Sequence, residues 1–312
     1  MNRVTEEADK RRDSTSSIDA STYTVQENSS SGEKFLTGLS RVEQPNRELT
    51  VVAMSNAESM GLIFPHWVRL CYRRGPFEYY PYDMNMPPKL IPRPPLHYKF
   101  DPPLTERGQI VAETYGRGLL NAGVRPYEVF CSPDMKSVQT AAFLIKGLGL
   151  SFTTINIDPA LIKYRQMVPA NYQEMLLSPK VFFGLGYPIN TQYTPFQGFF
   201  GSENIDDYNL RIQSFFEQRI AKIEQKQVIV ISDNVMVDMT QNIRIETVDD
   251  IMKCTKKPTC QINFISIKPG EAQLMNSPVL PLTKSLYAVK SIYWSEVPQK
   301  LSAPNHPEVY QD

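Results

Sequence analysis

The chain has 312 residues, 41% of them hydrophobic, which is enough for one large domain or two small ones. Basic and acidic residues balance at 33 each, so no charge bias points to nucleic acid or to an anionic membrane. The apolar runs are far too short to span a bilayer, and the first residues lack the apolar core of a signal peptide. We therefore expect a cytoplasmic or nuclear protein that binds neither nucleic acid nor membrane.

The cysteines form neither a C-x-x-C pair nor a disulfide framework. The four residues are Cys71, Cys131, Cys254 and Cys260. This spacing suits reduced thiols inside a cell. No histidine lies near Cys254 and Cys260, so we expect no bound metal and no cofactor.

Composition divides the chain into three parts. Residues 1–48 are rich in Ser, Thr, Glu and Lys and predict a disordered tail, because few large apolar side chains are present to offset the entropy lost on ordering. Residues 49–300 alternate strand-like and helix-like segments and predict one folded domain. Residues 301–312 predict a C-terminal tail.

The first half of the domain begins with an apolar strand at 51–54, and a helix is expected over 59–73 despite Pro65. Seven prolines then fall between Pro87 and Pro103, a density that predicts an extended loop with no helix and no central strand. Thr105 is a suitable N-cap for a helix that runs to about Asn121, where Gly123 ends it.

The second half continues the alternation. Ser132-Pro133 marks the start of a helix that lies between two expected strands. Residues 164–204 predict an irregular aromatic loop or cap. The expected helices cover 134–150 and 205–224, and the expected strands cover 127–131, 152–157, 228–231, 261–267, 272–275 and 288–293. Strands that alternate with helices indicate a three-layer α/β/α sandwich with a mainly parallel sheet.

Three segments resemble motifs of the histidine phosphatase superfamily, whose fold is that of phosphoglycerate mutase. DPPLTERGQIVAE at 101–113 is similar to its helix start, and VFCSPDMKSVQTAAFL at 129–144 to its strand-turn-helix. QVIVISDNVMV at 227–237 stands where the family has a late strand that ends in alanine-histidine. TVVAMSNAES at 50–59 then occupies the place of the strand end that carries the family's nucleophile.

Further segments resemble the phosphatase domain of the TULA proteins, suppressors of T-cell receptor signalling. They are DMNMP at 83–87, DPALIKY at 158–164 and SPVLPLTKS at 277–285. The resemblance covers about 48–296, and it implies dimerisation, either with a second copy or with a relative.

The resemblance also implies a reaction in which a histidine accepts a phosphoryl group. Arginines and a second histidine surround the phosphoryl oxygens, and a carboxylic acid protonates the leaving group. Along the first motif, Ser55 replaces an arginine, Asn56 the nucleophilic histidine and Ser59 the second arginine, while Glu58 is retained. An amide nitrogen has no available lone pair, so Asn56 cannot act as the nucleophile.

The other family positions are also substituted. Lys136 replaces an arginine and loses its bidentate fork, Lys163 replaces the acid, and Asp233 replaces the late histidine. The three histidines of the chain are His66, His97 and His306, and none ends a predicted strand. We therefore expect a pseudophosphatase without catalytic residues, acting as a scaffold, a regulator or a complex subunit.

Several alternatives stay open. Ser55 or Ser59 with Lys136 could form a serine–lysine hydrolase, and Glu58, Asp233 and Asp238 could form a divalent-metal site. A residual or repurposed phosphatase would act on a phosphorylated protein or small molecule. The simpler hypothesis is that the substituted residues fill the former pocket by hydrogen bonding, with a Lys136–Asp233 salt bridge across it. The aromatic insert at 164–200 is either a partner surface or a cap over the pocket.

Overall fold

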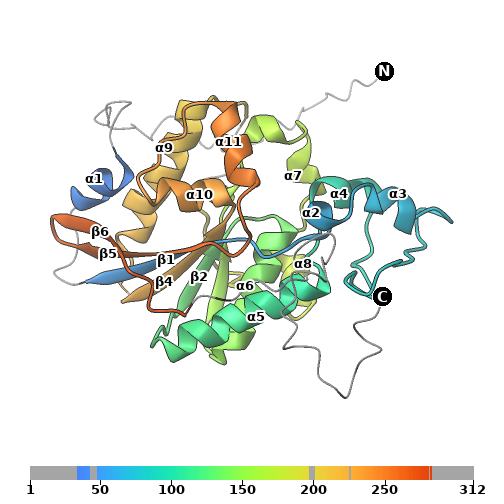
Figure 1. Ribbon diagram of the computed structural model, residues 1–312, viewed down its shortest axis with the longest axis horizontal. Helices are drawn as coiled ribbons and strands as arrows, with labels where there is room; N and C mark the ends of the chain where they lie inside the picture. The colour runs from blue at the N-terminus through green and yellow to red at the C-terminus, as the bar shows by residue number, and fades with distance from the viewer. Residues whose placement is uncertain (1–33, 43–47, 197–200, 225, 281, 283–312) are drawn as a thin grey trace, which may run out of the picture. The chain divides into compact units, whose positions relative to one another are not determined.

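The computed structural model describes residues 34–42, 48–196, 201–224, 226–280 and 282. The strand expected at 288–293, the C-terminal tail expected at 301–312, and residues 1–33 and 43–47 of the tail expected at 1–48 lie outside these residues. The centre of the domain is a six-stranded sheet in the order β3-β2-β4-β1-β5-β6 (Figure 1). Its strands are β1 (Leu49–Ser55), β2 (Glu128–Cys131), β3 (Thr154–Ile157), β4 (Gln227–Ser232), β5 (Ile262–Lys268) and β6 (Glu271–Met275).

Four of these strands are parallel. β1 pairs with β4, β4 with β2, and β2 with β3 in the same direction, while β5 and β6 are antiparallel. The mainly parallel sheet predicted from the sequence is therefore present, extended by an antiparallel edge. Because the carboxyl ends of parallel strands meet at one edge, the segments after β1, β2, β3 and β4 lie together there.

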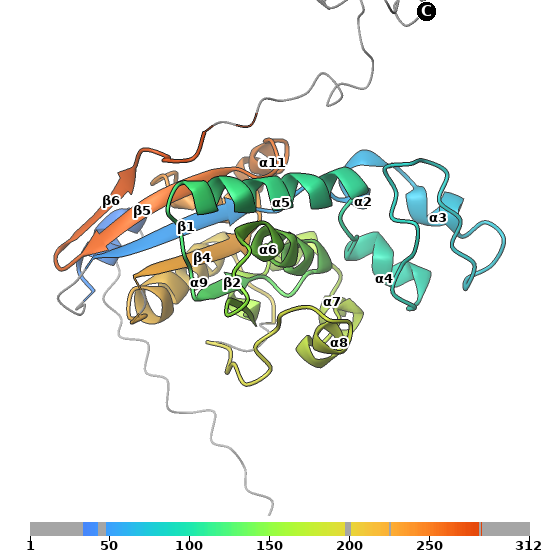
Figure 2. The same cartoon turned by 90° about the horizontal axis from the view of Figure 1, so that it is seen from below.

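Helices cover both faces of the sheet, which confirms the three layers. One face packs against α5 (Glu106–Asn121) and α6 (Met135–Leu148), and the other against α1, α9, α10 and α11 (Figures 1 and 2). Alternate residues of β1 enter different cores: Val52 and Met54 face α5 and α6, whereas Val51 and Ala53 face the opposite layer. The helices of that opposite layer are α1 (Phe35–Ser40), α9 (Ile205–Phe215), α10 (Asn234–Met239) and α11 (Val248–Thr255).

The predicted helix starts and stops follow the capping chemistry. The Thr105 hydroxyl accepts a hydrogen bond from the Gly108 N–H at the start of α5, and Gly123 lies just past its end with φ of 83°. The Asp134 carboxylate caps α6 by accepting from the Ser137 N–H.

Two predictions around the prolines were wrong. The helix expected over 59–73 is split into α2 (Met60–Ile63) and α3 (Trp67–Cys71), because the chain turns at Pro65 and His66, whose φ is 58°. The proline-dense segment contains a short helix, α4 (Pro95–Phe100). A proline at the first helical position has no N–H to lose and a φ already suited to a helix, so this composition does not forbid one.

Two further predictions need correction. Within the tail expected at 1–48, α1 is ordered, and Phe35 and Leu39 are buried with Phe216 in the second core. The helix expected over 205–224 ends at Phe215 and continues as one π-helical turn, Phe216–Ile220.

The insert at 164–204 has more regular structure than expected. Three short helices follow a 3₁₀ turn at Pro159–Leu161: a second 3₁₀ turn at Arg165–Met167, α7 (Tyr172–Met175) and α8 (Pro179–Gly184). Helix α11 was not predicted, although Thr247 and Asp250 form the capping box that signals its start. Within the described residues, no helix is both long and apolar enough to cross a bilayer.

Candidate functional site

The site lies at the carboxyl edge of the four parallel strands. Asn56 follows β1, Asp134 precedes α6 after β2, and Asp233 follows β4. Lys163 comes two residues after the 3₁₀ turn that follows β3. The fold thus brings together the positions that the sequence predicted as a former catalytic centre.

Asn56 is buried and engaged with the start of α6. The Ser137 hydroxyl oxygen lies 2.6 Å from Asn56 Oδ1 and 2.8 Å from Asp134 Oδ1. The Asn56 N–H donates to the Ser232 carbonyl at 2.9 Å, which continues the β1–β4 pairing by one residue. Asn56 therefore links the end of β1 to the end of β4 and to the first turn of α6.

The two serines of this segment are also buried, at 1% exposure for Ser55 and 7% for Ser59. The Ser55 hydroxyl accepts from the Gln261 N–H at 2.9 Å, and the Ser55 N–H donates to the Gln261 carbonyl at 2.8 Å. Ser59 pairs with Leu104 in an isolated bridge ahead of α2. No described contact joins either serine to Lys136, so the serine–lysine pair is not formed.

Glu58 is held at the start of α5. Its Oε1 accepts from the Thr105 hydroxyl at 2.8 Å and from Asn85 Nδ2 at 3.0 Å. Its Oε2 lies 3.9 Å from an Arg107 nitrogen. A Cβ at Gly108 would lie 2.1 Å from the Glu58 carbonyl oxygen, so only glycine allows this close approach.

Asp101 ties the proline-dense segment to α6. Its Oδ1 accepts from the Met135 N–H at 2.6 Å, and its Oδ2 pairs with the Arg93 guanidinium at 2.8 Å. Burial raises the pKa of Asp101 to about 6, although Arg93 opposes the rise. The Arg93 guanidinium also stacks on the Tyr98 ring, 4.1 Å from its centre.

Lys136 and Asp233 do not form the predicted salt bridge. The Asp233 carboxylate instead caps α10, accepting from the Val235 and Met236 N–H groups at 3.1 and 3.2 Å. Burial raises the pKa of Asp233, and the charge of Lys136 partly offsets the rise. The backbone cap holds the carboxylate at the end of β4, and Lys136 acts on it only through its electrostatic field.

Lys163 packs against an aromatic side chain of the insert. Its amine lies 5.0 Å from the centre of the Tyr172 ring, and Tyr172 is fully buried. Burial is the main cause that lowers the pKa of Lys163 to about 8, and Lys136 lowers it further.

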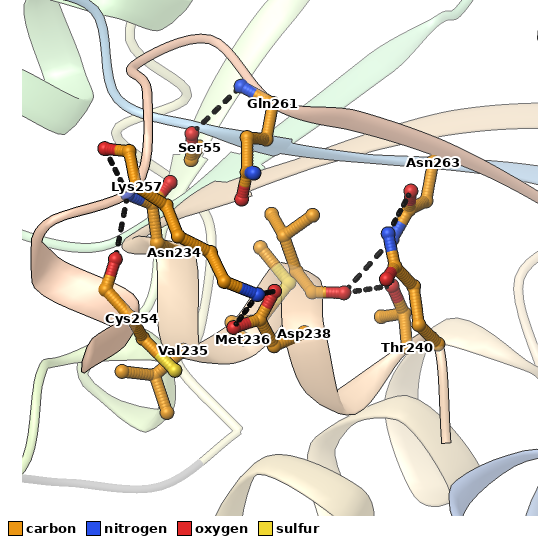
Figure 3. A network of polar contacts seen from close by, with 12 residues as sticks. Ser55, Asn234, Val235, Met236, Asp238, Thr240, Cys254, Lys257, Gln261 and Asn263 are labelled. Atoms are coloured by element: carbon orange, nitrogen blue, oxygen red, sulfur yellow. Dashed lines mark hydrogen bonds and ion pairs between the residues drawn. The ribbon is translucent and has the colours of Figure 1, made fainter. Parts of the chain in front are cut away.

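Asp238, proposed above as part of a metal site, lies in a separate network on α10 (Figure 3). The Lys257 amine contacts both Asp238 carboxylate oxygens at 2.7 Å, and Asn234 Nδ2 donates to the carbonyls of Cys254 and Lys257 at 3.1 Å each. Each of the three carboxylates therefore has its own partners: Asp238 binds Lys257, Asp233 caps α10, and Glu58 binds Thr105 and Asn85. Across the described part of the chain, no three His, Cys, Asp or Glu side chains are grouped to hold a metal, so that alternative fails.

The described histidines lie in helical and loop segments. His66 is exposed between α2 and α3, and His97 is half-buried in α4. His306 lies outside the described residues. Neither described histidine comes from a strand end.

A cleft of about 340 Å³ lies away from the strand ends, between the proline-dense segment and α5 and α6. Pro87, Leu90, Tyr98, Gln139 and Phe143 are among its lining residues. Its walls include Met135, the first residue of α6, but none of the substituted family positions.

The family model of the histidine phosphatase superfamily (branch 1) matches residues 96–277, more than half of the chain. The chain belongs to the histidine phosphatase superfamily. The matched range begins after β1 has ended, so it leaves out both Ser55, the last residue of that strand, and Asn56, which follows it.

Curated members of the superfamily give 25% identity. The ecdysteroid-phosphate phosphatase of Drosophila melanogaster matches over 77% of this chain and 33% of its own length. The human ubiquitin-associated and SH3 domain-containing protein B matches over 73% of this chain and 37% of its own length. The chain therefore spans about a third of the curated relatives that it matches.

A solved structure agrees on the fold. The ecdysone phosphate phosphatase of Bombyx mori, in complex with tungstate, aligns with a TM-score of 0.62 at 23% identity. The alignment covers 76% of this chain and 95% of that one. The expected phosphoglycerate mutase-like fold is thereby confirmed.

Sequence reasoning missed several residues that shape this superfamily site. Ser137 binds both Asn56 and Asp134, Asn85 binds Glu58, and Tyr172 contacts Lys163. Asp134 was detectable as an N-cap ahead of α6. Tyr172 carried no signal, because its contact depends on how the insert folds back over the sheet edge.

Proposed function

We propose that this chain is a pseudophosphatase: a member of the histidine phosphatase superfamily that does not transfer phosphoryl groups and acts by binding other proteins. The observation that carries the proposal is Asn56, which stands at the nucleophile position and is fixed by Ser137 and the end of β4. Its amide offers phosphorus no lone pair.

The surroundings of Asn56 support the same proposal. Ser55 and Ser59 carry no charge, and Lys163 supplies an amine where the family has an acid. The positive charges of Lys136 and Lys163 are offset by the carboxylates of Asp233 and Asp134. The arginines that would add positive charge in the family are absent from the substituted positions. Loss of one nucleophile or key donor costs factors of about 10² to 10⁶ in rate, so the combined substitutions leave no route by this mechanism.

The test is a phosphatase assay on the purified full chain. Para-nitrophenyl phosphate and an ecdysteroid phosphate serve as substrates, with the Drosophila ecdysteroid-phosphate phosphatase as the active control. We expect phosphate release at the rate of buffer alone. Release that a Lys136→Ala, Asp233→Ala double variant abolishes would overturn the proposal and favour the alternative, a repurposed phosphatase.

We propose that the partner surface is not the insert but the arm surface, defined as the exposed apolar side chains between α2 and the proline-dense segment. In the insert, Tyr164, Tyr172 and Phe182 are buried against the domain, whereas Phe183 is 57% exposed, so most of its described large aromatics serve to cap the sheet edge. In the arm surface, Phe77 is 94% exposed and Met84 is 98% exposed. Its other members are Leu62, Ile63, Leu70, Tyr80 and Tyr82.

Such a group of exposed apolar and aromatic side chains is typical of an interface. It lies on the part of the domain that contains α3 and the loop after it, beyond the carboxyl edge of the sheet (Figures 1 and 2). Arg74 stacks on Tyr80 at 4.2 Å within it, and arginine and tyrosine are common hot-spot residues. The partner is another protein, either a second copy, a relative or an unrelated chain.

Affinity purification with mass spectrometry tests this surface. Partners that co-purify in stoichiometric amounts with the native chain should be lost with a Phe77→Asp, Met84→Asp double variant. The control is Phe152→Asp, which places the same charge at a half-exposed aromatic beside the opposite end of β3. Equal recovery from both variants would exclude the arm surface.

A further inference from the structure

The amine of Lys163 lies in a site that the pseudophosphatase proposal leaves unused. Within the described residues, no ion pair or hydrogen bond occupies the side chain of Lys163 or of Lys136. The two lysines come from the segments that follow the adjacent strands β3 and β2. Both lie at the carboxyl edge of the sheet, where the charged side chains of Asp134 and Asp233 also lie.

The backbone that carries Lys163 is firmly fixed. The buried Arg211 side chain donates to the carbonyls of Ala160 and Ile162 at 2.7 and 2.9 Å. The Ser232 hydroxyl donates to the Leu161 carbonyl at 2.6 Å. The site is therefore built by α9 and the end of β4, and does not depend on a loose loop.

The aromatic residue under the Lys163 amine carries a second unpartnered group. The Tyr172 side chain is fully buried and its hydroxyl has no hydrogen-bond partner, an arrangement that is rare in proteins. Burial raises the pKa of Tyr172 well above its ordinary value, and the charges of Asp134 and Asp101 raise it further, so the hydroxyl stays protonated. A buried hydroxyl without a partner is a donor that a ligand oxygen can satisfy.

Burial and a neighbouring cation increase the fraction of Lys163 that carries a neutral amine. Burial and Lys136 lower its pKa to about 8, while Asp134, Asp101 and Asp233 act in the opposite direction. At pH 7 roughly a tenth of the molecules then carry the free amine, compared with well under a thousandth for an ordinary lysine. Desolvation and a neighbouring cation are the usual means of activating a lysine as a nucleophile.

We propose that Lys163 binds small anionic carbonyl compounds, of the α-oxo acid class, as an imine, with Lys136 pairing with their carboxylate. The Lys163 amine attacks the carbonyl carbon and forms a C–N bond. The carbonyl oxygen takes up the hydrogens released by the amine and leaves as water when the C=N bond forms. The two hydrogens of the amine balance this water, and no oxidant or reductant takes part.

Reductive trapping of the full chain tests the proposal. The protein is incubated at pH 7 with glyoxylate and sodium cyanoborohydride, and peptide mapping locates the resulting N-carboxymethyl-lysine. Lys253 is the internal control, because it is exposed and its pKa is raised by Asp250. We expect Lys163 to be modified about tenfold faster than Lys253, or more. Equal rates, or modification confined to exposed lysines, would overturn the proposal.

Two variants and a pH series separate the roles. Lys163→Arg keeps the charge and should abolish the trapped adduct at this position while thermal unfolding shows an intact fold. Lys136→Gln should slow trapping of glyoxylate more than trapping of neutral propanal, and equal slowing would remove Lys136 from the site.

The rate at which Lys163 is trapped should level off above about pH 8, whereas the rate for Lys253 should keep rising. Because propanal and glyoxylate are not phosphorylated, these results are independent of the phosphatase assay.

Discussion

Asn56, Ser55 and Glu58 show how a substituted centre remains well packed. Each is buried or nearly so, and each makes hydrogen bonds to a neighbouring element: Asn56 to α6, Ser55 to the residue before β5, and Glu58 to the start of α5. A buried polar group without a partner costs about 1–3 kcal/mol, so these contacts stabilise the strand end even without a ligand. Among the substituted positions, the side chains of Ser59, Lys136 and Lys163 have no such partner in the described contacts.

Gly108 offers a test of this packing. We expect Gly108→Ala to lower the free energy of unfolding by about 1–3 kcal/mol, because the new Cβ would lie 2.1 Å from the Glu58 carbonyl oxygen. Urea denaturation measures the change. Gly184→Ala is the matched control: it is helical with nothing within 4 Å of the new Cβ, and should be neutral or stabilising. A neutral Gly108→Ala would show that α5 can move away from the strand end.

At the scale of elements, α10 connects the end of β4 to α11 and β5. Asp233 caps its first turn, Asn234 holds the carbonyls at the end of α11, and Asp238 binds Lys257 (Figure 3). On the other side, Asn263 of β5 donates to the Val237 carbonyl at 2.8 Å. These contacts hold a helix of only six residues that propensity alone would not keep folded.

The Asp238–Lys257 pair tests this connection. Lys257→Met leaves the Asp238 carboxylate, 2% exposed, without its cation, and should cost about 3–5 kcal/mol of unfolding free energy. Asp238→Leu combined with Lys257→Met should recover most of the loss, since no charge is then left buried. A double-mutant cycle by chemical denaturation measures both. A double variant as unstable as Lys257→Met would assign the loss to packing and not to charge.

At the scale of the whole domain, the insert is joined to the body through a buried ion pair. Arg211 of α9 binds both oxygens of Glu203 at 3.0 and 2.7 Å, and Glu203 also accepts from the Arg165 N–H. Tyr164 packs edge-on against Tyr208 of α9 in the same region. The capping insert, the Lys163 segment and α9 therefore form one packed unit.

Arg211→Met should loosen this unit. We expect a loss of about 3–5 kcal/mol, because Glu203 is left buried without its partner. Amide hydrogen exchange should increase most over residues 158–168. The control is Arg244→Met, which breaks an exposed pair with Glu246 and should change stability by less than about 1 kcal/mol. Exchange that rises evenly across the domain would show that the ion pair supports the fold as a whole.

The sequence by itself determined the elements that depend on local patterns. The apolar runs of β1 and β4, the Thr105 cap and the motif spacing were enough to predict the layered fold and the positions of Ser55, Asn56, Lys136 and Asp233. These features follow from backbone periodicity and capping, which neighbouring residues encode.

Only the tertiary structure decided which groups meet. Asp233 bonds to its own helix instead of Lys136, Asp238 turns to Lys257, and Tyr172 returns from the insert to cover Lys163. The exposed arm surface was likewise hidden in the sequence, since apolar residues predict burial. Such contacts join residues far apart in the chain, and their geometry depends on how all the layers pack together.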